Sequence, residues 1–263
     1  MLIDFHVHLF PDNLAGRTLE HLAQIAQAPY YTRGTVSDTL RRMDEAGVDV
    51  GVVQHIATKP SQQKTINNFA ASIQNERLVC FGTVHPDAED VMEELYRIRE
   101  LGLKGIKLHP DYQNFYVDDP HLAMLYETAQ ALQLPILMHT GYDPVSPESI
   151  HGPAQAVAQV AHSYPQLTLI AAHMGGLNEY DRAERYLVGS NVYLDMSMSS
   201  IYCQPEQFIR MVHRHGADRI LFATDCPWST AEDEMRLLDQ VPLSIREKAM
   251  ICYGNAQRIL GID

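Results

Sequence analysis

A short apolar, β-branched segment followed by a longer stretch with helical spacing recurs along the whole chain, and this alternation restricts the fold more than any other feature. Strands separated by helices pair in parallel through right-handed crossovers, and eight such units close into a barrel. The sequence therefore predicts a single (β/α)₈ TIM barrel. The expected strands are Leu2–Val7, Val48–Gln54, Leu78–Val84, Leu103–Leu108, Leu134–Met138, Leu167–Ala172, Val192–Met196 and Ile220–Thr224.

The segments between these strands have the pattern of amphipathic helices. Residues 35–47 begin with the capping residue Thr35, space apolar residues three and four apart, and end at Gly47. The segment Pro11–Gly34 is too long for a simple connection, so we expect an extra loop or helix over the barrel mouth. The other expected helices are Asp90–Leu101, His121–Leu132, Pro153–Tyr164, Pro205–His215 and Ser244–Leu260.

The length of the chain supports one domain over residues 1–263. A chain of 263 residues is close to the typical length of a TIM barrel, and it contains no internal repeat or flexible linker. An open doubly wound sheet is the alternative fold. That fold usually places a glycine-rich phosphate turn after the first strand, and the first strand here is followed by His6-Val-His8-Leu-Phe-Pro instead.

Composition and charge exclude several classes of partner. The formal net charge of −13 disfavours nucleic acids and anionic membranes, because both require a basic face. No stretch of eighteen apolar residues or signal-peptide pattern occurs, and the four cysteines are scattered, so we expect a cytoplasmic protein with reduced thiols. A small-molecule substrate is the expected partner, and a homodimer is compatible with a barrel of this kind.

Polar residues gather where the predicted strands end. In this fold the active site lies at the C-terminal ends of the strands, where buried imidazole or charged groups require an explanation. Side-chain alternation places Asp4, His6 and His8 toward the barrel axis and Ile3, Phe5 and Val7 toward the helices. The residues at the strand ends are His6, His8, His55, His85, Lys107, His109, His139, His173 and Asp225, and we expect Lys107, His109 and Asp225 to point inward.

Such a set predicts a divalent-metal site. Imidazole nitrogens with a carboxylate suit Zn²⁺, and also Mn²⁺ or Fe²⁺, and a catalytic ion keeps one position open for water. Each residue alone has an ordinary explanation, because His139 could be a core histidine and Asp225 a helix cap. Their occurrence together at matching strand ends favours one metal centre.

The sequence resembles the amidohydrolase superfamily, in the branch that includes aminocarboxymuconate-semialdehyde decarboxylase. The resemblance covers nearly the full length and lies in Asp4-Phe-His6-Val-His8, Met43-Asp-Glu-Ala-Gly47, Gly105-Ile-Lys107-Leu-His109-Pro, Leu137-Met-His139-Thr-Gly, His173-Met-Gly-Gly and Thr224-Asp225-Cys-Pro-Trp228. It implies that His6, His8, His139 and Asp225 ligate the metal and that His173 contacts the reacting group or the metal-bound water.

The role of Lys107 is left open by this resemblance. Binuclear members carry a carboxylated lysine on the fourth strand, whereas members of this branch usually hold one ion. Lys107 could therefore bridge two ions, bind a substrate carboxylate, or form a structural ion pair with Asp4. We expect His109, Tyr142 and Trp228 to contact substrate with Lys107, since they lie at the predicted rim.

The expected activity is hydrolysis of an amide, ester or lactone bond in a small carboxylated substrate. A bound divalent ion lowers the pKa of water to about 7 and supplies a hydroxide nucleophile. Asp225 could accept the water's proton while His173 stabilises the developing oxyanion. The alternative is a metal-dependent, non-oxidative decarboxylase. A catalytically inactive binding barrel is a third interpretation, which the intact set of metal-binding residue types disfavours.

Overall fold

The structure, a computed structural model, describes residues 1–262, and its strands run parallel in two hydrogen-bonded groups. The first group has the order β1-β2-β3 and the second has the order β4-β5-β6-β7-β8. Their bounds within the described residues are β1 Ile3–Val7, β2 Val50–Gln54, β3 Leu78–Phe81, β4 Ile106–Leu108, β5 Ile136–Met138, β6 Leu169–Ala171, β7 Tyr193–Asp195 and β8 Ile220–Leu221.

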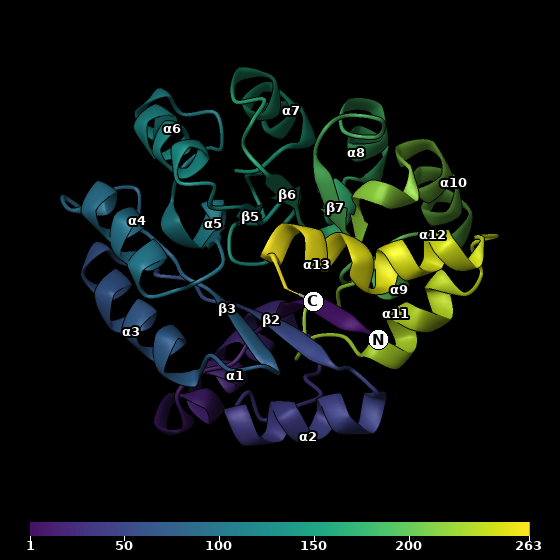
Figure 1. Cartoon of the computed structure of the whole chain (residues 1–263), viewed down its shortest axis with the longest axis horizontal. Coiled ribbons are helices and arrows are strands. Elements are labelled where there is room, and N and C mark those ends of the chain that lie inside the picture. Colours follow the sequence, from purple (N-terminus) through teal and green to yellow (C-terminus); the bar gives the residue numbers. More distant parts are fainter. Residues whose placement is uncertain (263) are drawn as a thin grey trace.

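Backbone contacts join the two groups on both sides and close the ring. A parallel bridge pairs Gly82, the residue after β3, with Ile106 of β4, and another pairs Val7 of β1 with Cys226 in the loop after β8. The amide of Phe5 also donates to the carbonyl of Phe222 at 2.9 Å. Figure 1 shows the strands inside a ring of helices, with α13 crossing one end of the ring near both termini. The predicted (β/α)₈ barrel is confirmed.

The helices surround the barrel and follow the predicted pattern. In α2 the side chain of Thr35 accepts from the amide of Asp38, and Gly47 ends the helix with φ 70°, a conformation that glycine adopts without strain. The α-helices are α1 Asp12–Ala26, α2 Val36–Ala46, α3 Gln63–Ile73, α4 Val91–Glu100, α5 Pro110–Gln113, α6 Ala123–Ala131, α7 Ala154–Ser163, α8 Tyr180–Tyr186, α9 Ser199–Tyr202, α10 Pro205–His215, α11 Ala231–Leu238, α12 Ile245–Ala249 and α13 Asn255–Leu260.

Short turns of tighter or wider helix complete the connections. They are η1 Pro60–Gln62, η2 Pro120–Leu122, η3 His173–Gly175 and η4 Ala217–Arg219, which are 3₁₀ turns, and η5 Met250–Gly254, a π-helical turn. Helix α1 lies in the long segment 11–34, where the sequence predicted an extra loop or helix.

Two hydrophobic clusters divide the core into an outer layer and a barrel interior. The outer layer joins the strands to the helices, whereas the interior contains residues from strands on opposite sides of the ring, such as Phe5, Leu137 and Leu221. Ala256 and Leu260 of α13 belong to the interior cluster and close one end of it. The site therefore rests on a filled core.

The predicted orientation of Ile3 and Phe5 is wrong. Both pack in the barrel interior, and the ring of Phe5 meets that of Phe81 edge to face at 5.6 Å. The register between β1 and β2 shifts, since Asp4 pairs with Gly51 but Val7 pairs with Val53. One extra residue in β1 thus reverses the alternation, so the apolar residues at its start and the histidines at its end share the inner side.

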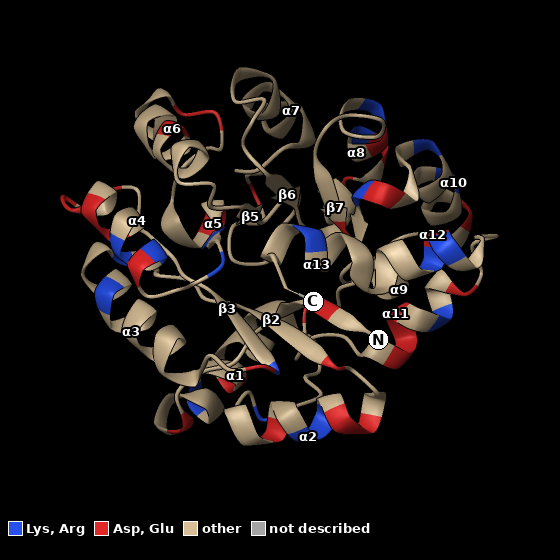
Figure 2. Cartoon of the chain, in the orientation of Figure 1, with Lys and Arg blue, Asp and Glu red and all other residues tan. Residues whose placement is uncertain are grey.

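Charged side chains lie mainly on the outer helices, while the strands within are nearly free of them (Figure 2). The exceptions within the barrel include Asp4, Lys107 and Asp195, all of which are buried. Buried charge of this kind requires partners or a function. Among residues 1–262, no helix is both long and apolar enough to cross a membrane.

Candidate metal centre

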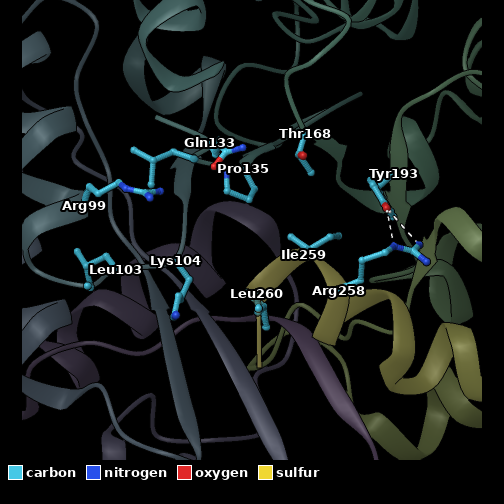
Figure 3. Close-up of a pocket in the computed structure, with 13 residues that line it drawn as sticks. Arg99, Leu103, Lys104, Gln133, Pro135, Thr168, Tyr193, Arg258, Ile259 and Leu260 are labelled. Atoms are coloured by element: carbon cyan, nitrogen blue, oxygen red, sulfur yellow. Dashed lines mark hydrogen bonds between the residues drawn. The ribbon is translucent and has the colours of Figure 1, made fainter. Parts of the chain in front are cut away.

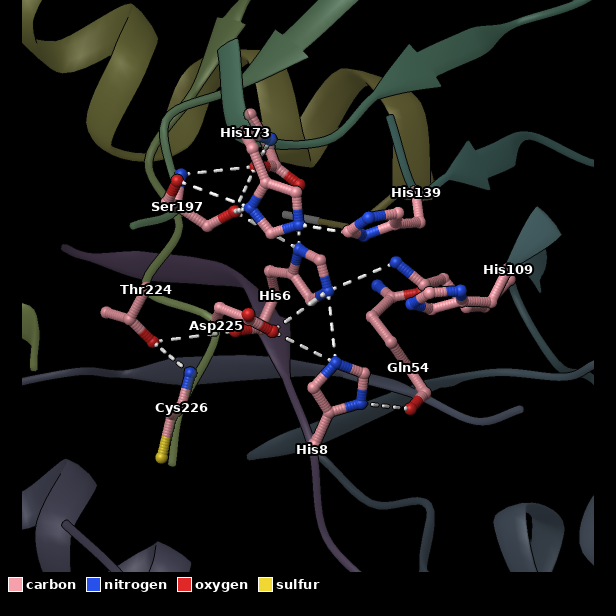
Figure 4. Close-up of polar contacts among 12 residues, drawn as sticks. His6, His8, Gln54, His109, His139, His173, Ser197, Thr224, Asp225 and Cys226 are labelled. Carbon is pink, nitrogen blue, oxygen red and sulfur yellow. Dashed lines mark hydrogen bonds and ion pairs between the residues drawn. The ribbon is translucent and has the colours of Figure 1, made fainter. Parts of the chain in front are cut away.

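Three side-chain atoms converge at the C-terminal ends of β1 and β8. The Nε2 atoms of His6 and His8 lie 3.2 Å apart, and the Oδ1 atom of Asp225 lies 3.3 Å from the first and 3.0 Å from the second (Figure 4). Asp225 reaches this position because Asp4 binds the backbone and hydroxyl of Thr224 and so fastens the start of the β8 loop to β1. We name His6, His8 and Asp225 the tripod.

The other nitrogen of each tripod histidine is held by an acceptor. Nδ1 of His6 lies 2.9 Å from Oδ2 of Asp195, and Nδ1 of His8 lies 2.9 Å from the carbonyl of Gln54. An acceptor at Nδ1 keeps the proton on that nitrogen, so both Nε2 atoms direct a lone pair at the same point. This arrangement, in which a carboxylate orients a ligating histidine, is typical of metal sites.

The electrostatics of the tripod favour a neutral His6 imidazole beside an ionised Asp225 carboxylate. Burial and the nearby Lys107 lower the pKa of His6 well below its ordinary value. Burial alone would raise the pKa of Asp225, but His6 and His8 hold it below its ordinary value. The Nζ atom of Lys107 lies 3.2 Å from Nε2 of His6, and burial lowers the pKa of this lysine to about 8.

His173 follows β6 and lies against the tripod, with its ring stacked on His6 at 5.4 Å. Its Nδ1 is 2.9 Å from the hydroxyl of Ser197, and its backbone amide donates to Oδ1 of Asp195 at 2.9 Å. Both His173 (φ 57°) and Asp225 (φ 68°) have left-handed backbones. Non-glycine residues adopt this conformation at a cost, and such strain is concentrated at functional sites.

His139, the fourth predicted ligand, lies in a second group. Its ring stacks on that of His109 at 4.1 Å, and Oδ2 of Asp143 lies 3.4 Å from Nε2 of His109 and 3.7 Å from Nε2 of His139. Nδ1 of His139 is 3.1 Å from Nε2 of His173, whose ring in turn stacks on His6. The structure therefore brings His6, His8 and Asp225 together and puts His139 with His109 and Asp143.

The four residues predicted to contact substrate do not all lie in the same group of side chains. Lys107 contacts the tripod, and none of its described contacts is an ion pair with Asp4. His109 belongs to the second group. Tyr142 brings its backbone carbonyl within 3.3 Å of Nε2 of His139, and Trp228 donates its backbone amide to the carbonyl of Asp225 at 2.8 Å. Their substrate contacts stay predictions.

Sequence reasoning missed Asp195 and Ser197. Both side chains are fully buried, and Oδ1 of Asp195 accepts from the amides of His173 and Ser197 as well as from the hydroxyl of Ser197. The sequence did contain a signal for Asp195. This carboxylate lies between Leu194 and Met196 in an otherwise apolar strand, and a charged group does not fit on the outer face of the strand, which the helices cover.

A separate cavity of about 570 Å³ lies at the opposite end of the barrel. Its lining residues precede or begin strands, such as Lys104 before β4, Thr168 before β6 and Tyr193 in β7, and Arg258 of α13 also contributes (Figure 3). Arg258 donates to the hydroxyl of Tyr193 and to the carbonyl of Asp218. None of the tripod residues lines this cavity, so it is distinct from the metal centre.

Comparison with known families identifies the chain over nearly its full length. The model of a family described as "Amidohydrolase" matches residues 3–262. The chain belongs to the amidohydrolase family. The resemblance seen in the sequence is thereby confirmed, together with the barrel that it implied.

Individual relatives of this family member include several decarboxylases. The chain is 26% identical over 285 residues to a gamma-resorcylate decarboxylase from Polaromonas sp. strain JS666, and the match covers 85% of the chain and 86% of the relative. Among solved structures, 5-carboxyvanillate decarboxylase from Sphingomonas paucimobilis is 18% identical with a TM-score of 0.75, and the match covers 100% of this chain and 99% of that one. A dihydroxybenzoic acid decarboxylase from Polaromonas sp. JS666 with bound manganese and the inhibitor 2-nitroresorcinol is 20% identical with a TM-score of 0.74, covering 99% and 96%.

These relatives overturn the main functional expectation. Hydrolysis of an amide, ester or lactone was the activity favoured from the sequence, and decarboxylation was its alternative. The gamma-resorcylate, 5-carboxyvanillate and dihydroxybenzoic acid enzymes all carry decarboxylase names, so the hydrolase interpretation is wrong and the alternative is the better one.

Proposed function

We propose that this amidohydrolase is a metal-dependent, non-oxidative decarboxylase acting on a small aromatic carboxylate. The observation that carries the proposal is the convergence of two imidazole nitrogens and one carboxylate oxygen next to a buried lysine, in a chain related to aromatic-acid decarboxylases. An ion at the tripod offers positive charge to a carboxylate, and Lys107 supplies more beside it.

The tripod residues fit a divalent ion. Donor atoms on one ion lie about 3.0–3.5 Å apart when each bond is about 2.0–2.2 Å long. The three tripod separations of 3.2, 3.3 and 3.0 Å match that range. Three protein ligands also leave open positions for substrate, as catalytic sites require. Two histidines and one aspartate suit Zn²⁺, Mn²⁺ or Fe²⁺, and the manganese in the related decarboxylase favours Mn²⁺.

When bound, the ion would anchor the substrate carboxylate and adjacent oxygen and withdraw negative charge from them. The chain's own residues perform the other tasks. Lys107 presents its ammonium group to the carboxylate, and burial, which lowers its pKa to about 8, excludes water from this contact. When charged, His173 carries a proton on both ring nitrogens, and the proton on Nε2, the nitrogen 3.1 Å from Nδ1 of His139, is the one that it can deliver to the ring carbon.

The chemistry balances without an oxidant or reductant. The ring carbon gains a proton, the bond between that carbon and the carboxylate breaks, and its electron pair restores the aromatic ring while carbon dioxide leaves. The imidazolium of His173 would be stabilised through the hydroxyl of Ser197 by the carboxylate of Asp195, which lies 2.5 Å from that hydroxyl. In this scheme Asp225 orients the ion and His173 is the catalytic acid.

The proposal is tested by measuring carbon dioxide release from a panel of hydroxylated benzoates, with lactones and amides in parallel. Enzyme loaded with Mn²⁺ should release carbon dioxide stoichiometrically with loss of substrate. The variants Asp225→Asn and His173→Asn should lose at least about 100-fold in rate, whereas the exposed His213→Asn control should retain wild-type rate. Cleavage of a lactone or amide, with no carbon dioxide from any benzoate, would refute the proposal.

Two broader assignments accompany this function. We propose that residues 1–263 act as one domain, because the family match spans residues 3–262. We also propose that the protein works in the cytoplasm, since its four cysteines are free thiols, which is the state expected in a reducing compartment.

A further inference from the structure

The cavity at the N-terminal ends of the strands has a positively charged lining. Arg99 of α4, Lys104 before β4 and Arg258 of α13 contribute to it, and no aspartate or glutamate among residues 1–262 does (Figure 3). In the whole chain acidic residues outnumber basic ones by 33 to 20. The lining of this cavity therefore reverses the charge balance of the chain.

The three basic residues also lack a carboxylate partner. Within residues 1–262, neither Arg99, Lys104 nor Arg258 forms an ion pair. Most other arginines of the described chain do so, namely Arg41, Arg42, Arg77, Arg97, Arg182, Arg210, Arg214, Arg219 and Arg236. Pairing with a carboxylate is thus the common state of an arginine in this acidic chain, and the arginines of the cavity depart from it.

Neutral groups hold the two arginines in place. Nη2 of Arg258 donates to the backbone carbonyl of Asp218 at 2.6 Å, and Nε of Arg258 donates to the hydroxyl of Tyr193 at 3.3 Å. Nη1 of Arg99 donates to the backbone carbonyl of Leu132 at 2.6 Å. These acceptors orient the guanidinium groups without neutralising them. Within residues 1–262, Nη1 of Arg258 and Nη2 of Arg99 have no hydrogen-bond partner, so each arginine keeps N–H groups for a ligand.

Other side chains of the lining add hydrogen-bond donors. The hydroxyl of Tyr193 accepts from Nε and Nη2 of Arg258, so its own proton is available to a further acceptor. Nζ of Lys104 and the hydroxyl of Thr168 have no hydrogen-bond partner within residues 1–262. An ammonium group offers three N–H donors and a threonine hydroxyl offers one. The cavity therefore presents donors of both kinds, charged and neutral.

The surroundings strengthen the field of these charges. Leu103, Leu134 and Leu260 line the same cavity and are buried, so the positive groups lie beside an apolar wall. A hollow with charges of one sign and a wall of low polarity concentrates the electric field and attracts ions of the opposite sign. Like charges around one hollow also repel each other, and an anion between them removes that repulsion.

We propose that this cavity binds a small anion with two or more negative charges on phosphate or carboxylate oxygens, held by Lys104, Arg99 and Arg258. Guanidinium and ammonium groups are the usual partners of both oxyanions. The volume of about 570 Å³ is in the range of small-molecule sites. Because no tripod residue lines the cavity, this site is separate from the metal centre. The inference does not depend on the proposed decarboxylase activity.

A bound anion would link segments that are distant in the chain. Arg99 and Lys104 come from the region of α4 and β4, whereas Arg258 belongs to α13, which crosses this end of the barrel (Figure 1). Leu260 of α13 also packs in the barrel interior. A ligand that binds only the folded chain raises its stability by an amount that grows with ligand concentration. We therefore expect the anion to raise the melting temperature.

The test is titration calorimetry of the full-length, Mn²⁺-loaded protein with inorganic phosphate at constant ionic strength. Wild-type protein should bind phosphate saturably in the millimolar range. Lys104→Gln should weaken this binding at least about 10-fold, and it removes no described hydrogen bond of the fold. Arg258→Gln should weaken it similarly. Arg246→Gln removes an exposed arginine of α12 that does not line the cavity, so this control should bind as the wild type does.

Melting temperatures measured in phosphate and in chloride give a second readout. Phosphate stabilises proteins in general, and Lys104→Gln shows the size of that general effect. The wild type should gain more from phosphate than Lys104→Gln does. Equal gains in the two proteins, together with equal affinities in calorimetry, would overturn the inference.

The variant His8→Asn separates the cavity from the metal centre. Phosphate binding that persists in His8→Asn and falls in Lys104→Gln supports the site. Binding that is lost in His8→Asn and unchanged in Lys104→Gln places the anion at the tripod and contradicts the inference. Succinate is titrated in parallel, and tighter binding of phosphate or of succinate assigns the oxyanion class. Absence of saturable binding for both anions refutes the site and leaves the proposed function intact.

Discussion

Glu234 of α11 should make the stability of the folded protein fall as the pH rises toward 8. Its side chain is completely buried, and its carboxyl oxygens accept from the hydroxyls of Ser229 and Ser200, at 2.8 and 2.7 Å, and from the amide of Ser200. Burial dominates and raises the pKa of this carboxyl from 4.5 to about 8. The group therefore stays protonated in the folded protein at neutral pH.

The sign and size of the effect follow from the difference between the pKa of Glu234 in the folded chain and its pKa in the unfolded chain. Between pH 4.5 and 8 the unfolded chain has released the proton and the folded chain has not, so each increase in pH favours unfolding. The slope approaches about 1.4 kcal/mol per pH unit, which gives about 2.7 kcal/mol between pH 5 and pH 7. Below pH 4.5 both states are protonated and the contribution is constant.

The variant Glu234→Gln removes the titrating group while keeping an amide that can bond to both serines. Urea unfolding at pH 5, 6, 7 and 8, followed by the fluorescence of the single tryptophan Trp228, gives the free energy of unfolding of each protein. The wild-type value should fall relative to the variant by the slope above. The exposed neighbour Glu232→Gln is the control and should parallel the wild type. Equal pH dependence of wild type and Glu234→Gln would refute the reasoning.

Three further changes test other contacts. Asp195→Asn should weaken metal binding about 10- to 100-fold by loosening His6, as measured by chelator competition. Gly141→Ala should lower the free energy of unfolding by about 3 kcal/mol or more. The backbone of Gly141 has φ 89°, and a Cβ atom there would lie 2.2 Å from the amide nitrogen of Leu177. The change in melting temperature measures this loss. His215→Asn should reduce the loss of stability in acid, since burial lowers the pKa of His215 to about 4 and its contribution to stability is lost as pH falls below about 6.5. Acid titration of wild type and variant, followed by circular dichroism, measures the difference.

The barrel could be predicted because its signals are local and repeated. Each strand segment is short, apolar and followed by a capped helix, so an error at one boundary leaves the alternation unchanged. The strands β4 and β8 are shorter than their predicted segments Leu103–Leu108 and Ile220–Thr224, but the structure has the predicted number and order of strands. The convergence of His6, His8 and Asp225 also follows from topology, because parallel strands end at the same edge.

Orientation within a strand was less predictable, and β1 shows why. Strict alternation assumes one residue per step, and the extra residue between Asp4 and Val7 breaks that assumption. No residue in Asp4-Phe-His6-Val is a glycine or proline that would mark the irregularity. The error reversed Ile3 and Phe5 but left His6 and His8 on the inner side, because the shift falls between the two pairs.

The sequence alone does not predict which atom each imidazole nitrogen of the site contacts. Nδ1 of His139 contacts Nε2 of His173, and Nδ1 of His173 contacts the hydroxyl of Ser197, which donates to Asp195, a residue of a different strand. Residues 56 positions apart in the chain are thus linked by a series of contacts of about 3 Å. A ligand set copied from a family motif specifies residue types at strand ends, whereas coordination requires atoms with free lone pairs directed at one point.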